Sequence, residues 1–277
     1  MPPQYPPIGE SDRHPGARRA LFGQLIGLGA LGLGACAQRG APLPQAGAVA
    51  TPDALPDSIA PFSSATPGAR PPAGWQPYVL RKDKPPTRYN VVRDNDRMVL
   101  HARAEAGATG LRCPVRIDPH QHSRLQFSWR VQQVPSLASV DVPEHDDAPA
   151  RIILAFDGDP ARLSLRDRLI FDQVELFTGQ RLPFATLMYV WCAKLPPESV
   201  VRNHRSSRIH YLTVESGAQR AGRWLHYERD VVADYRRVYG EAPGMISSVG
   251  VLTDSDALKH EQQAWYGDIV LRRPGRT

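Results

Sequence analysis

The chain has 277 residues, of which 42% are hydrophobic, and its formal net charge at pH 7 is +6. Acidic and basic residues are mixed along it, without a run of like charges or an interleaving of aromatic and basic residues, which argues against nucleic-acid binding. Three cysteines without a CxxC motif argue against structural zinc and against a thioredoxin-type redox site.

The first 35 residues are typical of an export signal. Three arginines precede an apolar run at 20–35, in which Gln24 is the only strongly polar residue. This run is too short and too rich in glycine for a stable membrane span. It ends in "LGAC", and small residues before Cys36 suit a lipoprotein signal peptidase. We therefore expect an exported protein that is lipidated at Cys36.

The flanking residues predict the route and the destination of the protein. Adjacent Arg18 and Arg19 resemble a twin-arginine export signal, and the general secretory route is the alternative. Ala37 stands where an aspartate usually retains lipoproteins at the inner membrane. We therefore expect a periplasmic lipoprotein held at the outer membrane by acyl chains, each buried methylene contributing about 0.8 kcal/mol.

The rest of the chain divides by composition. Residues 36–74 are mostly Ala, Pro and Gly with few large apolar side chains, which predicts a disordered tether. Residues 75–273 are long enough to bury one core and are expected to form a single domain, followed by a tail at 274–277.

Apolar and polar residues alternate through this domain. In "RLQFSWRV" at 124–131, every second residue is apolar, as in a half-buried antiparallel strand. We expect further strands at 89–92, 97–104, 109–117, 150–156, 186–193, 208–216, 223–232, 246–254 and 264–273. The first two flank Asp94-Asn95-Asp96, which favours a hairpin turn.

One segment has helical periodicity instead. In "SLRDRLIFDQVELFTG" at 164–179, one stripe is expected to carry Leu165, Leu169, Ile170, Val174 and Phe177. Ser164 and Asp167 resemble a capping box, and Gly179 suits a C-cap. A shorter helix is expected at 233–240. The pattern predicts a mainly β fold, an antiparallel two-sheet β-sandwich with one or two short helices.

Few residues suggest a metal or redox site. "HEQQA" begins like the zinc motif HExxH, but Ala264 stands where the second histidine is needed. Asp254 and Asp256 in "TDSD" point the same way on an extended chain and are candidate ligands for Ca²⁺, although a turn is the favoured interpretation. No other cofactor is expected. Cys113 and Cys192 form either a disulfide or two buried free thiols.

Aromatic residues on the strands leave two interpretations open. Tyr189 and Trp191 lie near arginines such as Arg151 and Arg208, so an exposed pair would form a platform for a sugar ring. Facing inward, the same residues would be core. Trp129 is expected in the core, because the residues on its face are all apolar.

The combination of "ESG" at 215–217, "DYRRVYG" at 234–240, "TDSD" at 253–256 and "YGDI" at 266–269 resembles a bacterial secreted family, domain of unknown function 3047. The resemblance covers residues 75–271 and implies no established activity, so no catalytic role is carried over. The last strands are also similar to the closing half of galactose-binding-like jelly rolls, which many carbohydrate-binding modules share.

Three functions stay open. The leading hypothesis is a non-catalytic module for a saccharide or another cell-envelope ligand, with contacts from Tyr189, Trp191, Arg151, Arg208 and Glu215 in one groove. The second is a glycosidase-like hydrolase that uses Glu215 and Asp147, whose carboxyl groups would lie ~5–5.5 Å or ~6.5–9.5 Å apart. The third is a structural envelope protein without a small ligand.

Overall fold

The computed structural model describes residues 55–79, 83–179 and 181–275. The predicted export signal, Cys36 and the tether up to residue 54 lie outside these residues. Within the described part of the chain, no helix is both long enough and apolar enough to span a membrane.

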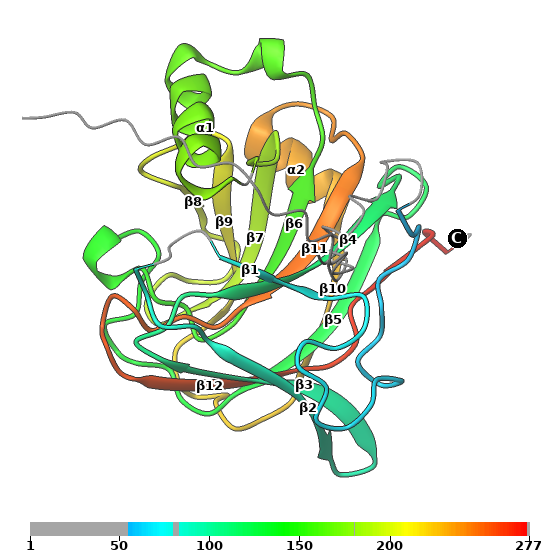
Figure 1. Cartoon of the computed structure of the whole chain (residues 1–277), viewed down its shortest axis with the longest axis vertical. Coiled ribbons are helices and arrows are strands. Elements are labelled where there is room, and N and C mark those ends of the chain that lie inside the picture. The colour runs from blue at the N-terminus through cyan, green and yellow to red at the C-terminus, as the bar shows by residue number, and fades with distance from the viewer. Residues whose placement is uncertain (1–54, 80–82, 180, 276–277) are drawn as a thin grey trace, which may run out of the picture. The chain divides into compact units, whose positions relative to one another are not determined.

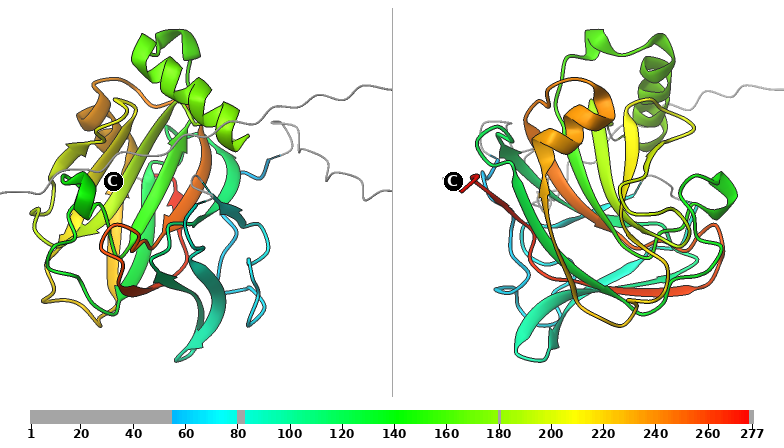
Figure 2. Two further views of the ribbon diagram at one scale, coloured as in Figure 1. Left: turned by 60° about the vertical axis from the view of Figure 1, so that its left-hand side comes forward. Right: turned by 180° about the vertical axis from the view of Figure 1, so that it is seen from behind.

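The described chain folds into two packed β-sheets, seen from three sides in Figures 1 and 2. The seven-stranded sheet has the order β1-β4-β11-β6-β7-β9-β8 and comprises Gln76–Tyr78, Gly110–Ile117, Ile246–Leu252, Arg151–Phe156, Ala185–Cys192, Ile209–Ser216 and Val200–Arg202. The six-stranded sheet has the order β10-β5-β12-β3-β2, with β13 also paired to β5. Its strands are Leu225–Asp230, Arg124–Val131, Glu261–Tyr266, Arg97–Glu105, Arg88–Asp94 and Val270–Arg272.

This architecture is the predicted mainly β sandwich of the jelly-roll type, with one departure. Strands β7 and β9 pair in parallel, whereas the other strand pairs of the described chain are antiparallel. The connection between β7 and β9 includes the short edge strand β8, which then pairs antiparallel with β9.

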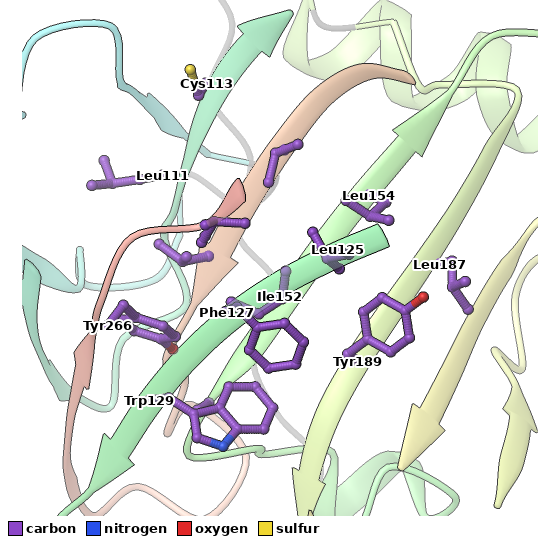
Figure 3. Packing of buried hydrophobic residues seen from close by; sticks show 14 of the residues in the cluster. Leu111, Cys113, Leu125, Phe127, Trp129, Ile152, Leu154, Leu187, Tyr189 and Tyr266 are labelled. Carbon is purple, nitrogen blue, oxygen red and sulfur yellow. The ribbon is translucent and has the colours of Figure 1, made fainter. Parts of the chain in front are cut away.

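Alternation along the strands produces the core between the sheets. On β5, Leu125, Phe127 and Trp129 point inward and are almost wholly buried, as expected. Figure 3 shows Phe127 and Trp129 packed near Tyr189 of β7. Burying each such side chain contributes about 1.5–3 kcal/mol, so this aromatic layer is a main source of stability.

The two helices lie at one end of the sandwich, opposite the β2–β3 hairpin (Figure 2). Helix α1, Leu165–Thr178, begins after Ser164, whose Oγ accepts a hydrogen bond from the Asp167 amide, and ends at Gly179 with φ +70°. Both predicted caps are confirmed. Helix α2, Val231–Tyr239, is capped by the side chain of Asp230.

The predicted apolar stripe of α1 is wrong for three of its five residues: Leu165, Leu169 and Phe177 are 74%, 62% and 71% exposed. Ile170 packs against the core beside buried Phe171, and Val174 is half-buried. The buried face also holds Asp167, which accepts hydrogen bonds from Ser206 and Ser207. These polar contacts fix the rotation of the helix, which the apolar pattern alone does not show.

Part of the predicted tether belongs to the folded domain. Phe62 is fully buried in the core, and the indole of Trp75 donates a hydrogen bond to the Ala60 carbonyl. Ser63 donates from its amide to Oδ1 of Asp268, 2.9 Å away. The prediction of disorder is therefore wrong for residues 56–74, because one phenylalanine anchors this proline-rich segment.

The C-terminal segment also differs from its prediction. Residues 256–259 form a turn, and β12 begins at Glu261, before the expected strand start at 264. The expected closing strand is split into β12 and β13 around Gly267. A Cβ atom on Gly267 would lie 2.3 Å from Oγ of Ser128, so a larger residue here would require that hydroxyl to rotate away.

Cys113 and Cys192 are free and buried, so the disulfide alternative is wrong and the two-thiol alternative holds. Cys113 lies on β4 and Cys192 on β7, with β11 and β6 between them. Three strand spacings amount to about 14 Å. A disulfide requires Cα atoms within about 7 Å of each other.

Candidate functional site

The two aromatic residues left open by the sequence lie in the core. Tyr189 and Trp191 are both fully buried. The hydroxyl of Tyr189 donates to Asp234, and the indole of Trp191 donates to the Gly217 carbonyl, each at 2.9 Å. Buried rings with satisfied polar atoms stabilise the sandwich and leave no face for a sugar.

Arg208 and Glu215 lie near opposite ends of β9. The Arg208 guanidinium donates to Glu241 at 2.8 Å and to the hydroxyl of Tyr235 at 3.2 Å. The Glu215 carboxylate accepts from the Tyr227 hydroxyl and, at 2.7 Å, from Arg220. Among the hydrogen bonds and ion pairs of the described residues, no second carboxylate shares these two donors with Glu215.

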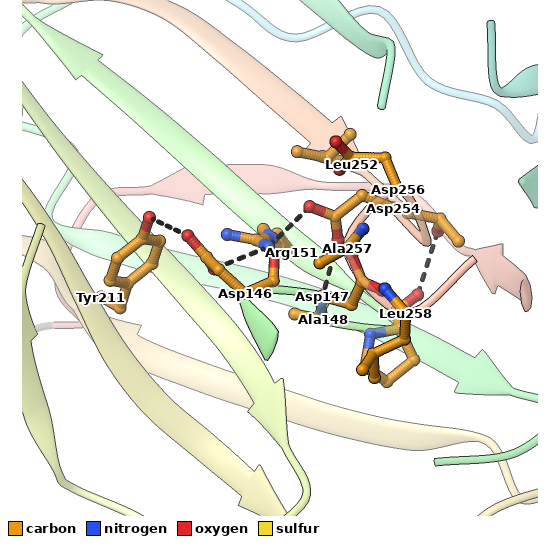
Figure 4. Close-up of polar contacts among 12 residues, drawn as sticks. Asp146, Asp147, Ala148, Arg151, Tyr211, Leu252, Asp254, Asp256, Ala257 and Leu258 are labelled. Carbon is orange, nitrogen blue, oxygen red and sulfur yellow. Dashed lines mark hydrogen bonds and ion pairs between the residues drawn. The ribbon is translucent and has the colours of Figure 1, made fainter. Parts of the chain in front are cut away.

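Arg151 lies in a separate buried network, shown in Figure 4. Its Nη2 donates to Asp254 at 2.6 Å and to Asp146 at 3.1 Å. Tyr211 donates its hydroxyl proton to the other oxygen of Asp146. Burial raises the pKa of Asp254 to about 7; Asp147 and Asp146 add to this effect, whereas Arg151 opposes it.

Asp147 and Asp256 complete this network. The two Asp147 oxygens accept from the amides of Ala257 and Leu258, at 3.0 and 2.8 Å. Asp256 pairs with Lys84 at 3.1 Å. The network therefore ties the loop after "TDSD" to the loop before β6. Asp254 and Asp256 lie where the chain turns, but their carboxylates bind the Ala148 amide, Arg151 and Lys84 instead of amides of their own turn.

The same residues can be tested as a metal site. Asp147, Asp254 and Asp256 each offer an oxygen within 4.8 Å of the others, which is a suitable spacing for cation ligands. However, Arg151 and Lys84 already supply two positive charges, and backbone amides occupy both oxygens of Asp147. With these oxygens already bound by Arg151, Lys84 and backbone amides, the donor set fits a hydrogen-bond network better than a Ca²⁺ site.

The predicted ligand contacts therefore do not share a groove. Tyr189 and Trp191 are core, Arg151 is in the carboxylate network, and Arg208 and Glu215 belong to two further contact groups.

The outer face of the six-stranded sheet carries an aromatic–arginine cluster that sequence reasoning missed. It comprises Arg97, His101, Arg130, Trp224 and Trp265. His101 stacks on Trp265 with ring centroids 4.9 Å apart, and the Arg130 guanidinium lies 4.3 Å from the centroid of Trp265. Arg97 lies 4.0 Å from the centroid of Trp224.

The register of the strands explains this cluster. Trp265 of β12 is directly opposite His101 on β3 and Arg130 on β5. Asp94 accepts from both Arg130, at 3.1 Å, and the indole of Trp224, at 2.6 Å. Because His101 and Arg130 cover Trp265 from its two neighbouring strands, the indole of Trp265 is not an open platform for stacking. We call this cluster of five residues the wall.

An open pocket adjoins this wall. It has a volume of about 530 Å³ and lies between β1, β2 and β3. We call it the β1–β3 pocket. Its polar lining includes Arg70, Arg88, Asn90, His101 and Arg103, and three prolines contribute apolar surface. His101 belongs to both the wall and the pocket, and its Nε2 donates a hydrogen bond to Oε1 of Gln263, 2.8 Å away.

A second cavity, of about 500 Å³, lies beside α1. It is lined by apolar side chains and by both acidic and basic groups, among them Asp157, Glu175 and Arg168. The Arg168 guanidinium already donates to the carbonyls of Leu163 and Ala161. Its lining holds charges of both signs, whereas the charged side chains that line the β1–β3 pocket are all arginines.

The sequence held a signal for the missed residues. Trp265 alternates with buried Ala264 and Tyr266, and its own face carries Glu261 and Gln263. A tryptophan that shares a strand face with polar residues is expected to be partly exposed.

The chain has low similarity to solved structures of saccharide-related proteins. A family 12 xyloglucanase from Bacillus licheniformis is 8% identical, with a TM-score of 0.41 and coverage of 76% of this chain and 97% of the other. A family 29 carbohydrate-binding module is 9% identical, with a TM-score of 0.32 and coverage of 77% of this chain and 91% of the other. An arabinose-bound family 51 α-L-arabinofuranosidase is 10% identical, with a TM-score of 0.39. The match covers 80% of this chain and 27% of the other, so the chain spans about a quarter of that enzyme. Similarity at this level supports no conclusion about function.

No curated protein matches the chain. A protein family does: the family described as a protein of unknown function, DUF3047, matches residues 73–270. This range runs from the segment before β1 to the start of β13 and contains both sheets, both helices and the β2–β3 side of the pocket. The chain belongs to the DUF3047 family.

Proposed function

We propose that the chain is a non-catalytic binding module for a saccharide or another cell-envelope ligand, and that the ligand binds in the β1–β3 pocket. The observation that carries this proposal is an open cavity of about 530 Å³ with several hydrogen-bonding side chains in its lining. Small-molecule sites in proteins typically have volumes of about 300–1,000 Å³.

The chemistry of the lining suits a hydroxyl-rich ligand. Arg88, Asn90 and His101 come from neighbouring strands and bring donors and an amide carbonyl to one surface. The prolines offer small apolar patches for the carbon face of a sugar ring. The wall of stacked rings beside the pocket holds His101 in place, so the site is formed before a ligand arrives.

A binding role agrees better with this pocket than catalysis does. None of the described residues that line it is an aspartate or a glutamate. Glycoside hydrolysis needs two carboxyl groups across the scissile bond. The two candidates from the sequence are committed elsewhere: Glu215 to Tyr227 and Arg220, and Asp147 to two backbone amides.

We propose the location of the module from the sequence. The apolar run at 20–35 and "LGAC" support export and lipidation at Cys36. Residues 37–54 would then separate the anchor from the folded domain. The proposed membrane partner is the outer membrane. Metabolic labelling with a palmitate analogue tests lipidation, because Cys36→Ala should abolish the label.

Binding can be measured by retention of the full chain on immobilised cell-wall glycans. We expect saturable retention that Asn90→Ala reduces at least about tenfold, because this change removes a donor and an acceptor from the pocket. Gln173→Ala on exposed α1 is the control and should retain the parent affinity. Absence of retention by a folded chain, or equal retention by Asn90→Ala, contradicts the proposal.

A further inference from the structure

We propose that the ligand of the β1–β3 pocket is anionic, a saccharide that carries a carboxylate or a phosphate. This inference rests on the binding function proposed above and specifies its ligand class. Three observations support it: the sign of the charges that line the pocket, the lack of partners for two of them, and the position of two arginines opposite each other.

The charges that line the pocket have one sign. Arg70, Arg88 and Arg103 contribute three guanidinium groups, and the described lining contains no acidic residue. A guanidinium presents planar, paired donors that match the oxygens of a carboxylate or a phosphate. A concave surface with one sign of charge also raises the local concentration of oppositely charged ligands.

Two of these arginines have no ionic partner. Arg103 pairs with Glu105 and Glu261, both at 3.0 Å. Within the described part of the chain, Arg70 and Arg88 form neither an ion pair nor a side-chain hydrogen bond. Their donors are therefore available to a ligand without the loss of an internal contact.

The third observation concerns strand register. Arg88 of β2 is directly opposite Arg103 of β3. Like charges in directly opposed positions destabilise an antiparallel pair. The glutamates beside Arg103 offset part of this repulsion, but nothing in the described chain neutralises Arg88. An anion between the two guanidinium groups would relieve the repulsion, and the same geometry would position its oxygens.

The test uses matched pairs of probes and isothermal titration calorimetry on the full chain. Trigalacturonic acid is compared with its methyl ester, which has the same rings without the charge, and glucose 6-phosphate is compared with glucose. We expect the acidic member of at least one pair to bind at least about tenfold more tightly. We also expect this affinity to fall as salt rises from 50 to 300 mM.

The variant Arg88→Gln locates the effect. It should lower the affinity for the acidic probe about tenfold, whereas Arg93→Gln, an exposed arginine on the same strand, should not change it. Because Arg88 opposes Arg103, the ligand-free Arg88→Gln chain should melt at no lower temperature than the parent. Loss of binding with an unchanged melting temperature therefore reports the contact and not unfolding.

The outcomes separate this inference from the function on which it rests. If neutral and acidic probes bind equally and Arg88→Gln has no effect, the anionic class is wrong while saccharide binding stands. If no probe binds to the folded chain and none of the immobilised glycans retains it, the proposed function fails as well. Tight binding of only the carboxylate or only the phosphate probe supports the inference and identifies the source of the charge.

Discussion

At the scale of single residues, the buried arginine of the carboxylate network is neutralised by acidic side chains. Arg151, with only 3% of its side chain exposed, lies between Asp146 and Asp254, and Lys84 pairs with Asp256. An unpaired buried ion costs several kcal/mol, so each of these groups is retained with its partner. This explains why an acidic cluster that looks like a cation site in the sequence instead joins two loops.

We expect Ca²⁺ at 2 mM to leave the melting temperature of the chain unchanged. A divalent ion would have to compete with Arg151 and Lys84, whose positive charges already lie at the carboxylates. Differential scanning fluorimetry with and without EDTA provides the measurement. A rise of several degrees that disappears in Asp254→Asn would show that the three aspartates bind the metal.

His210 predicts a pH dependence of stability. Burial, with Arg202 and Arg208 nearby, lowers its pKa from 6.5 to about 4. Between pH 4 and pH 6.5, His210 binds a proton in the unfolded chain but not in the folded chain. This contribution to stability is therefore complete above pH 6.5 and is lost as the pH falls toward 4. From pH 7 to pH 5 the loss is about 2 kcal/mol.

Urea unfolding at both pH values measures this loss. Asp254 acts in the opposite direction over part of the same range, because its pKa is raised, so the parent chain alone cannot isolate the histidine. The loss attributable to His210 is the difference between the parent and His210→Leu. His226→Gln, which changes an exposed histidine on β10, should behave as the parent. An unchanged pH dependence in His210→Leu would refute the assignment.

At the scale of elements, the sequence predicted what local rules determine. Alternation identified β5 because one face of a sandwich strand must be apolar, and Ser164 and Gly179 identified the ends of α1 because both act on backbone groups next to them. The rotation of α1 and the split between β12 and β13 depend on Ser206, Ser207 and Ser128, which are distant in the sequence. No pattern within the segments themselves reveals those contacts.

The candidate site could not be predicted from local sequence patterns either. Trp191 and Trp265 both lie on strands with aromatic neighbours, yet one is fully buried and the other faces outward. The difference follows from the layer to which each face belongs, which only the sheet order establishes. The β1–β3 pocket joins residues from 70 to 111, and its outline depends on the pairing of β1 with β4 and of β2 with β3.

The corrected orientation of α1 gives a stability prediction. Leu169→Gln should change the free energy of unfolding by less than about 0.5 kcal/mol, because this side chain is 62% exposed. Phe171→Ala should lower it by about 3 kcal/mol, because Phe171 is buried against the sandwich. Both are measured by urea unfolding. A loss of 2 kcal/mol or more for Leu169→Gln would contradict this orientation of the helix.

At the scale of the whole molecule, the domain begins earlier than the composition suggests. Residues 56–74 read as a tether because prolines and alanines dominate them, and a single phenylalanine does not alter that average. In the structure Phe62 reaches the core, and Ser63 binds Asp268 close to the C-terminus. The segment therefore connects the beginning of the domain to its end.

We expect Phe62→Ala to lower the free energy of unfolding by about 3 kcal/mol, the usual loss for a buried phenylalanine. Asp57→Ala, which changes an exposed residue of the same segment, should have no measurable effect. Chemical denaturation of both variants measures these free energies of unfolding. Equal stability of Phe62→Ala and the parent would restore the tether interpretation.

The central claim is that the β1–β3 pocket binds a saccharide, and amide chemical-shift mapping by NMR tests it most directly. Titration of the full chain with trigalacturonic acid should shift the amides of Arg88, Asn90 and His101, in proportion to occupancy. Residues of α1, at the opposite end of the sandwich, should not shift (Figure 2). Saturable shifts that cluster at α1, or no shifts at all for any saccharide bound on glycan surfaces, would contradict the claim.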